Sequence, residues 1–328
     1  MFDAPRQSFW ILGILAACSS APPPAGHSTP NPPTPGSPAR APDRSFELPV
    51  VMQDHRWFLQ TTTTTGAPIR IYLDSAGGLY LTNAAASRLQ LERKPVEVDS
   101  HRADGVVFPA LADRRIPPAR IDVVPLLKGE FDEDGMFGAP WFSPHTFTFD
   151  YPRQKMILRT PGDLPRVAPE HRVTVAFRND TDGVGAYGRI QMIVDSQSID
   201  MLFDTGATVR LTDVGIQALG GTAKMRATSF ITDAVFQRWR KAHPTWRVIE
   251  DASHEGDLLH VPMIEVPTLT VGGYDVGPVW FTWRPDSAFH SFMAQYMDKP
   301  AEGALGGSAF YDLRISVDWA AGAATFER

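Results

Sequence analysis

Two short stretches of this chain repeat the same acidic turn, IYLDSAGGLYLT at residues 71–82 and MLFDTGATVRLT at residues 201–212. Aligned without a gap, they place Asp74 over Asp204, 130 positions apart. Apolar residues precede the Asp in both stretches, as expected where a buried strand ends in a turn. The repeat therefore predicts two equivalent turns that each present one carboxyl group.

A second pair of stretches strengthens this repeat, GMFGAPWFSPHTFTFDY at residues 135–151 and GALGGSAFYDLRISVDW at residues 303–319. They align without a gap at an offset of 168, with Gly138 over Gly306, and each ends in an Asp followed by an aromatic residue. Two motifs in the same order in both halves are a strong signal of an internal duplication.

The spacing between the two motifs differs between the halves. From the Asp of the first motif to the Gly of the second there are 64 positions in the first half and 102 in the second. The second half thus contains about 38 additional residues, which we expect near residues 221–258. The predicted organisation is an N-terminal lobe over residues 46–165 and a C-terminal lobe, with the insertion, over residues 166–328.

Composition narrows the class of protein. The chain has 328 residues, a formal net charge of −6 and 43% hydrophobic residues, which is enough for a sizeable core. The mild acidity argues against nucleic-acid binding, because phosphate recognition needs a basic face. No run of 18 apolar residues occurs, so no transmembrane helix is predicted.

Short runs of alternating apolar residues dominate from residue 46 onward and predict β-strands between turns. Examples are WFLQTTTTT at residues 57–65 and IRIYLD at residues 69–74. Helices are expected only at residues 228–244, with Thr228 or Ser229 as the cap, and at 287–297. The pattern as a whole therefore predicts an all-β fold with few short helices.

The first residues of the chain are typical of an export signal. The apolar run SFWILGILAA at residues 8–17 is too short for a membrane span but suits a signal peptide. The following stretch, Leu15-Ala16-Ala17-Cys18, resembles the lipobox of bacterial lipoproteins. That resemblance implies a signal peptide over residues 1–17 and lipidation of Cys18, the only cysteine. An ordinary signal peptide with an incidental Cys is the alternative.

Residues 18–45 are rich in proline and contain almost no large apolar residue, so they are predicted to be an extended tether. By the lipoprotein resemblance, Ser19 after the Cys favours the outer membrane. The predicted location is therefore the bacterial cell envelope, with the protein anchored to the membrane through Cys18 and facing the periplasm.

Taken together, the two repeated motifs resemble those of the pepsin- and retropepsin-like aspartic proteases, in a bilobal bacterial form, from about residue 50 to the C-terminus. The resemblance implies an acid-protease-like fold of two pseudo-twofold-related β lobes, with Asp74 and Asp204 as the catalytic pair. Two carboxyl groups about 3 Å apart cannot both ionise, so they share one proton and supply both a base and an acid. The implied substrates are peptides or proteins, and the implied enzyme is a monomer without cofactor or metal.

The same resemblance assigns roles to the residues around each Asp. The hydrophobic–hydrophobic–Gly elements packed beneath the carboxyl groups would be Met136-Phe137-Gly138 and Ala304-Leu305-Gly306. The turns that support the pair would be Ser75-Ala76-Gly77 and Thr205-Gly206-Ala207. In the family the hydroxyls of Ser75 and Thr205 bond across the lobe interface, and Gly206 presents its amide to the carboxylate.

The first turn departs from the family pattern at Ala76, where a Gly is expected. If position 76 requires a positive φ, Ala costs about 1 kcal/mol or more, which Gly77 and Gly78 would relieve. The next positions, Gly77 and Ala207, lack the hydroxyl that pepsin-like enzymes usually have there. Because a lost hydrogen bond to the charged form raises a carboxyl pKa, we expect an activity optimum of about pH 5–7.

Four weaker signals are assigned structural roles or left as loops. A substrate-covering hairpin is expected within residues 98–111, with Ala103-Asp104-Gly105 as its turn. The motif GVGAYG at residues 183–188 precedes a strand pattern and is predicted to be a turn rather than a dinucleotide site. His254 and His260 are predicted to be surface loop histidines without a metal. Asp150 and Asp318, at the ends of equivalent strands, are expected to be structural turn residues.

The function predicted from the sequence is an aspartic endopeptidase. One alternative is an inactive, lipid-anchored peptide-binding module whose first lobe has degenerated at Ala76. The other alternative is an enzyme that uses only Asp204, through homodimerisation of the second lobe.

Overall fold

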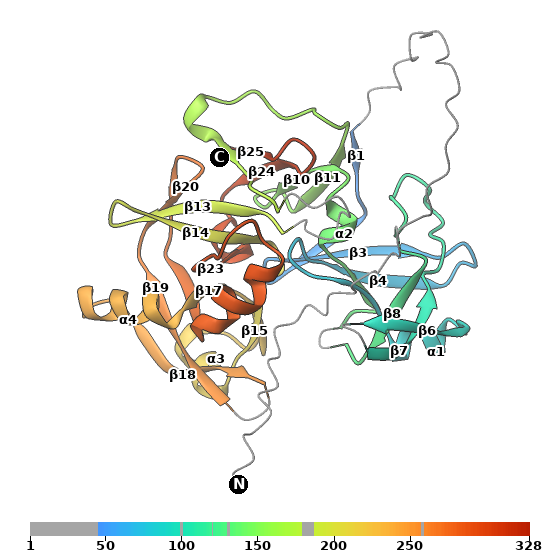
Figure 1. Cartoon of the computed structure of the whole chain (residues 1–328), viewed down its shortest axis with the longest axis horizontal. Helices are drawn as coiled ribbons and strands as arrows, with labels where there is room; N and C mark the ends of the chain where they lie inside the picture. Colours follow the sequence, from blue (N-terminus) through green and yellow to red (C-terminus); the bar gives the residue numbers. More distant parts are fainter. Residues whose placement is uncertain (1–44, 99–100, 120, 130–131, 179–186, 257–258) are drawn as a thin grey trace, which may run out of the picture.

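The computed structural model describes residues 45–98, 101–119, 121–129, 132–178, 187–256 and 259–328. Strands build these parts of the chain and the helices are short, so the expected all-β fold is confirmed. Figure 1 shows two lobes side by side, the N-terminal one in blue and green and the C-terminal one in yellow to red. The predicted signal peptide, Cys18 and most of the GVGAYG motif lie outside the described residues.

The N-terminal lobe is a sheet with the strand order β2-β3-β4-β9-β5-β8-β7-β6. Strand β9 lies in its middle, parallel to β4 and antiparallel to β5, and β5 is parallel to β8. The strands are β2 (Val50–Gln53), β3 (Arg56–Thr62), β4 (Pro68–Leu73), β5 (Leu79–Thr82), β6 (Arg93–Val98), β7 (His101–Val107), β8 (Val123–Leu127) and β9 (Gly135–Phe137).

The C-terminal lobe is a sheet with the order β18-β19-β22-β17-β23-β14-β13-β20-β21. Strand β23 again lies beside a parallel strand, β14, and an antiparallel one, β17, which is parallel to β22. The strands are β13 (Arg189–Val194), β14 (Gln197–Asp204), β17 (Ser229–Thr232), β18 (Val248–Glu255), β19 (Leu259–Val266), β20 (Leu269–Val271), β21 (Tyr274–Val276), β22 (Val279–Arg284) and β23 (Gly303–Gly306).

The two sheets therefore share one arrangement. The order β3-β4-β9-β5-β8-β7-β6 in the first sheet corresponds to the order β13-β14-β23-β17-β22-β19-β18 in the second. Each neighbouring pair keeps its parallel or antiparallel sense. This repeated arrangement confirms the bilobal architecture expected from the duplicated motifs.

A third sheet joins the lobes about a pseudo-twofold axis. Its order is β1-β11-β10-β24-β25-β12, in which β10 and β24 pair antiparallel at the centre. Thr148 pairs there with Ser316, its own equivalent at the offset of 168, and their hydroxyl oxygens are 2.6 Å apart. A residue can pair with its own equivalent only on a twofold axis, so the axis runs through this pair. The strands are β1 (Phe46–Glu47), β10 (Thr146–Asp150), β11 (Lys155–Arg159), β12 (Arg172–Thr174), β24 (Arg314–Asp318) and β25 (Ala323–Glu327).

Elements without a counterpart in the described residues of the first lobe lie at three places in the second. One is the pair of turns η2 (Ala288–Phe292) and η3 (Met293–Gln295) between β22 and β23. Between the Asp204 turn and β17 come β15 (Thr208–Arg210), α3 (Asp213–Leu219) and β16 (Met225–Ala227), and the β20–β21 hairpin separates β19 from β22. Residues 221–258, where the insertion was expected, mostly form β17, helix α4 (Asp233–Ala242) and β18, and both of these strands have counterparts in the first lobe. Motif spacing gives only the total excess of residues, so it could not locate the additions.

The helices differ from their predicted forms. The helix expected over residues 228–244 begins only after Thr232, because residues 229–232 pair with β22 and β23 as strand β17. Residues 287–297 form a π-turn followed by a 3₁₀ turn rather than an α-helix. The helices are α1 (Asn83–Arg88), α2 (Ala139–Phe142), α4 (Asp233–Ala242), η1 (Pro169–His171), η2 (Ala288–Phe292), η3 (Met293–Gln295) and η4 (Gly307–Ala309). Within the described ranges, no helix is long and apolar enough to cross a membrane.

Aromatic side chains fill the core where the three sheets meet. Phe149 of the central sheet lies 6.2 Å from Phe203, which precedes Asp204, and Phe203 lies 5.4 Å from Phe310, all between ring centroids. Each of these rings is at most 2% exposed. Because protein interiors are close-packed, this cluster gives the Asp204 turn a rigid base.

Candidate active site

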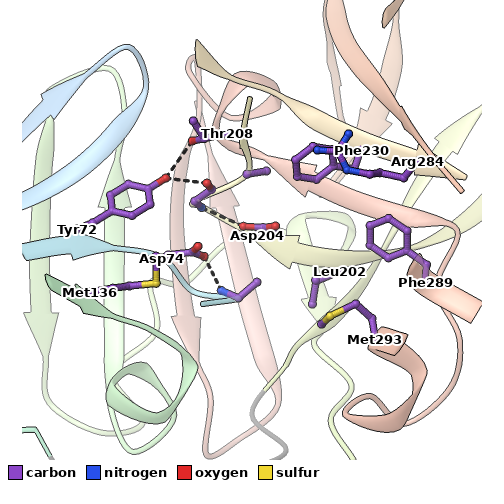
Figure 2. A pocket seen from close by; sticks show the side chains of 13 residues that line it. Tyr72, Asp74, Met136, Leu202, Asp204, Thr208, Phe230, Arg284, Phe289 and Met293 are labelled. Atoms are coloured by element: carbon purple, nitrogen blue, oxygen red, sulfur yellow. Dashed lines mark hydrogen bonds between the residues drawn. The ribbon is translucent and has the colours of Figure 1, made fainter. Parts of the chain in front are cut away.

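Asp74 and Asp204 lie at equivalent ends of equivalent strands. Asp74 follows the last residue of β4, and Asp204 is the last residue of β14. They are only 5% and 8% exposed, respectively. Both line one pocket between the lobes, where Figure 2 shows them at its centre. The fold thus brings together the two carboxyl groups that the sequence places 130 positions apart.

The two turns hold each other through reciprocal hydrogen bonds. The Ser75 amide donates to Thr205 Oγ1 at 3.1 Å, and the Thr205 amide donates to Ser75 Oγ at 3.0 Å. Ser75 Oγ also donates to the carbonyl oxygen of Phe203 at 3.0 Å. Ser75 and Thr205 are buried, and buried bonds of this kind hold their partners firmly in place. These hydrogen bonds between the two turns fix the relative position of the two carboxyl groups.

Each carboxyl group accepts bonds from the amides of its own turn. The Ala76 amide donates to Asp74 Oδ1 at 2.8 Å, and the Gly206 amide donates to Asp204 Oδ1 at 3.0 Å. The amides of Gly77 and Ala207 also bond to Asp74 and Asp204, respectively. Backbone donors favour the charged form of a carboxyl group, so these amides act to lower both pKa values.

Burial acts in the opposite direction and is the stronger effect. It raises the pKa of Asp74 to about 6, against the lowering by the Ala76 amide. Burial also raises the pKa of Asp204 well above its usual range, and the charge of Asp74 raises it further. Because the two side chains are hydrogen-bonded to each other, they titrate as a unit that keeps one proton over a range of pH.

The hydrophobic–hydrophobic–Gly elements lie beside the Asp strands. Phe137 in β9 and Leu305 in β23 are fully buried, and the Asp74 amide donates to the Phe137 carbonyl oxygen at 3.1 Å. A Cβ at Gly138 would lie 2.0 Å from the Gly77 carbonyl oxygen, and one at Gly306 would lie 1.8 Å from that of Thr228. Both positions therefore require glycine for the close approach of another backbone.

Ala76 fits the first turn without backbone strain. Neither Ala76 nor Gly206 has a positive φ, so the expected strain at position 76 does not arise. The two positions still differ in space, because a Cβ at Gly206 would lie 2.1 Å from Asp74 Cγ. Ala76 places its methyl against the apolar cluster that contains Leu202 and Met293. In the first turn the restricted position is Gly77, where a Cβ would lie 2.4 Å from Met136 Sδ and 3.0 Å from Asp74 Cγ.

Two functional residues were not found from the sequence. Tyr72 donates to the Gly206 carbonyl oxygen at 2.6 Å and lies 3.0 Å from Thr208 Oγ1, so the first lobe holds the turn of the second (Figure 2). Its position two residues before Asp74, on the same strand face, is a signal that could have revealed it. Arg284, at the end of β22, also lines the pocket, and no motif marks it.

The pocket itself is narrow and largely apolar. It has a volume of about 60 Å³, which is room for a few water molecules. Apolar walls come mainly from the second lobe, namely Leu202, Phe230, Phe289 and Met293.

A hairpin exists over most of the expected residues, but its predicted turn is wrong. Ala103-Asp104-Gly105 lie inside strand β7, paired with β6, because Val98 pairs with His101 and the connection falls at residues 99–100. Those two residues lie outside the described ranges. The described residues of this hairpin do not line the pocket.

The remaining candidate residues lie outside the pocket. Asp150 accepts a bond from the Arg153 amide and Asp318 accepts one from the Ala321 amide, so both close equivalent turns. His254 and His260 pair across β18 and β19 rather than lying in a loop. Among the described residues, no group of three or more His, Cys, Asp or Glu side chains is placed to hold a metal ion.

The chain thus has an all-β fold of two lobes related by a pseudo-twofold axis, with one Asp turn in each. No family model matches this chain, and no curated protein matches it either. Three similar solved structures are an aspartic proteinase from Irpex lacteus, basic 7S globulin from soybean, and conglutin gamma, a basic 7S globulin from lupine seeds.

The similarity to these structures is distant. The TM-scores are 0.46, 0.45 and 0.44, with 9%, 11% and 10% identity. The alignments cover 86% of this chain and 97% of the proteinase, and 87% of this chain and 95% of each globulin. Similarity at this level transfers no residue role to this chain.

Proposed function

We propose that this protein is an aspartic endopeptidase in which Asp74 and Asp204 activate a water molecule. The observation that carries the proposal is the buried pair itself. Two carboxyl groups from equivalent turns line one pocket, are hydrogen-bonded to each other and have raised pKa values. Perturbed, coupled carboxyl groups in a cleft are typical of acid–base catalysis.

The chemistry follows from the single shared proton. The ionised carboxylate takes a proton from water as the water oxygen attacks the peptide carbonyl carbon, while the protonated carboxyl group donates its proton to the carbonyl oxygen. The tetrahedral intermediate then collapses: a proton passes to the leaving nitrogen, the C–N bond breaks, and the pair recovers its single proton. The backbone donors from Ala76 and Gly206 keep both carboxyl groups oriented throughout.

The alternative function is a peptide-binding module without catalysis. Ala76 in place of glycine favours it, because its methyl group lines the pocket beside the carboxyl pair. An enzyme that uses Asp204 alone through homodimerisation remains a second alternative, in which Asp74 would be dispensable.

We also propose that the protein acts at a membrane. The lipobox-like Leu15-Ala16-Ala17-Cys18 and the proline-rich residues 18–45 support a lipid anchor and a tether. The proposed setting is a monomer on the periplasmic side of a bacterial outer membrane. Metabolic labelling with a fatty acid, in the native chain and in Cys18→Ala, tests the anchor; equal labelling of both chains contradicts it.

Catalysis is tested with the full chain in detergent and a mixed peptide library. We expect the wild type to cleave, and Asp74→Asn and Asp204→Asn each to abolish cleavage. If only Asp204→Asn is inactive, the homodimer alternative holds. If the wild type binds peptides without cleaving them, the binding-module alternative holds.

A further inference from the structure

The pocket contains a buried cation that water activation does not use. Arg284 is 7% exposed and lines the same pocket as Asp74 and Asp204. In Figure 2 it lies on the second-lobe side, across Asp204 from Tyr72. Its guanidinium carbon lies 4.1 Å from the centre of the Phe230 ring, so one face of the group is covered by an aromatic surface.

Only part of this guanidinium group is engaged. Nη1 donates to the Trp283 carbonyl oxygen at 2.9 Å and to Glu255 Oε2 at 2.8 Å. Among the described residues, no bond is recorded for Nε or Nη2. A guanidinium group has five N–H donors arranged in a planar fork that matches a carboxylate. The edge without a recorded bond is therefore suited to a second carboxylate.

The first lobe shows that the fold does not need an arginine at this position. Leu127 of β8 pairs with Thr82 of β5, just as Arg284 of β22 pairs with Thr232 of β17. Leu127 is therefore the pseudo-symmetric counterpart of Arg284. Replacing a buried ion pair with apolar residues is often neutral or stabilising. A buried arginine where its counterpart is leucine therefore indicates a binding role rather than a structural one.

We propose that Arg284 forms a subsite for a substrate carboxylate beside the Asp74–Asp204 pair. This inference rests on the proposed peptidase function and adds a preference for acidic substrates. The carboxylate belongs either to an acidic side chain near the scissile bond or to a free C-terminus. Leu202, Phe289 and Met293 would contact the aliphatic part of the bound residue.

Charge balance is consistent with this subsite. The catalytic pair is negative when it holds one proton, so an acidic substrate needs a nearby cation to enter. Glu255 neutralises Arg284 only from the Nη1 side. Burial raises the pKa of Glu255, which makes its protonation easier when a second carboxylate binds the same guanidinium group.

The experiment uses the full-length protein in detergent and matched decapeptides. The peptides differ by Glu or Gln at one position, and each is made with a free acid or an amide at its C-terminus. We compare the wild type with Arg284→Lys, and with Arg284→Leu combined with Glu255→Gln. The double variant removes both charges and places the first-lobe residue at position 284.

We expect the wild type to cleave the acidic member of one matched pair with a kcat/KM at least about tenfold higher, as for a charge-assisted bond. In the double variant this ratio should fall towards one, and in Arg284→Lys it should be intermediate, because lysine keeps the charge without the fork. Which pair shows the preference, Glu against Gln or acid against amide, identifies the source of the carboxylate.

A structural role for Arg284 would lower cleavage of all peptides alike and leave the ratios unchanged, which would overturn the subsite. Equal cleavage of all matched pairs by the wild type, with Asp74→Asn inactive, would overturn the subsite and leave the peptidase function intact. No cleavage of any peptide by the wild type would overturn both.

Discussion

The buried carboxyl pair should make folding stability fall as pH rises, and Asp74→Asn should remove much of this loss. Folding raises both pKa values, that of Asp74 from 3.8 to about 6. Between these pH values the folded state binds more protons at this pair than the unfolded chain does, so the pair's contribution to stability is highest below about pH 4 and declines above it. A shift of about two units corresponds to about 3 kcal/mol.

Asparagine has nearly the same shape as aspartate but cannot ionise. The variant should therefore match the wild type at about pH 3.5, where both carboxyl groups are protonated, and gain about 3 kcal/mol relative to it at about pH 7. Equilibrium urea unfolding followed by tryptophan fluorescence measures both free energies of unfolding.

Asp318→Asn is the matched control. Asp318 is also buried, at 3% exposure, but it accepts bonds from the amides of Gly162 and Ala321 and lies outside the pocket. Its removal weakens charge-assisted bonds, so this variant should gain nothing at neutral pH. If Asp74→Asn gives a difference from the wild type that is the same at both pH values, the carboxyl groups do not share a buried site and the reasoning fails.

Three further predictions concern the turns and their chemistry. Tyr72→Phe leaves the Gly206 carbonyl oxygen without its donor and should lower the free energy of unfolding by about 1–3 kcal/mol in urea; an unchanged midpoint would contradict this. Gly206→Ala places a Cβ 2.1 Å from Asp74 Cγ and should abolish cleavage. Ala76→Gly should retain cleavage and lower the free energy of unfolding by only about 0.4–1 kcal/mol; equal losses of cleavage activity in the two variants would refute this difference. Because Asp74 has a pKa of about 6, the pair holds two protons well below that pH and its single shared proton from about that pH upward; a pH–rate profile should peak at about pH 5–7, and a maximum below about pH 3.5 would contradict it.

The duplicated motifs were sufficient to predict the bilobal architecture, because both motifs occur in the same order in each half and each can be recognised from neighbouring residues alone. An apolar strand that ends in Asp-Ser or Asp-Thr predicts its own turn, and Gly138 and Gly306 mark close backbone approaches that any side chain would block. Element boundaries were less predictable. Residues 229–232 were assigned to the expected helix because Thr228 or Ser229 could cap it. They form strand β17 instead, since Phe230 and Ile231 suit a strand and the segment pairs with β22 and β23.

Local sequence could not reveal residues whose role depends on the other lobe. Tyr72 acts on Gly206 and Thr208, more than 130 positions away. Arg284 reaches the pocket only because β22 lies two strands from β23 in the sheet. The predicted turn at Ala103–Gly105 was wrong because a two-strand register is set by pairing, here Val98 with His101.

The sequence by itself determined that there are two Asp turns, where each begins, and which glycines stand beside them, because these features depend on neighbouring residues. Only the tertiary structure decided that the two carboxyl groups lie in one buried pocket with raised pKa values, that Ala76 adopts an unstrained conformation, and that Arg284 lies beside the pair. The physical reason is that burial, charge coupling and hydrogen bonds between lobes depend on distances in space, which are set only when the two sheets close about their common axis.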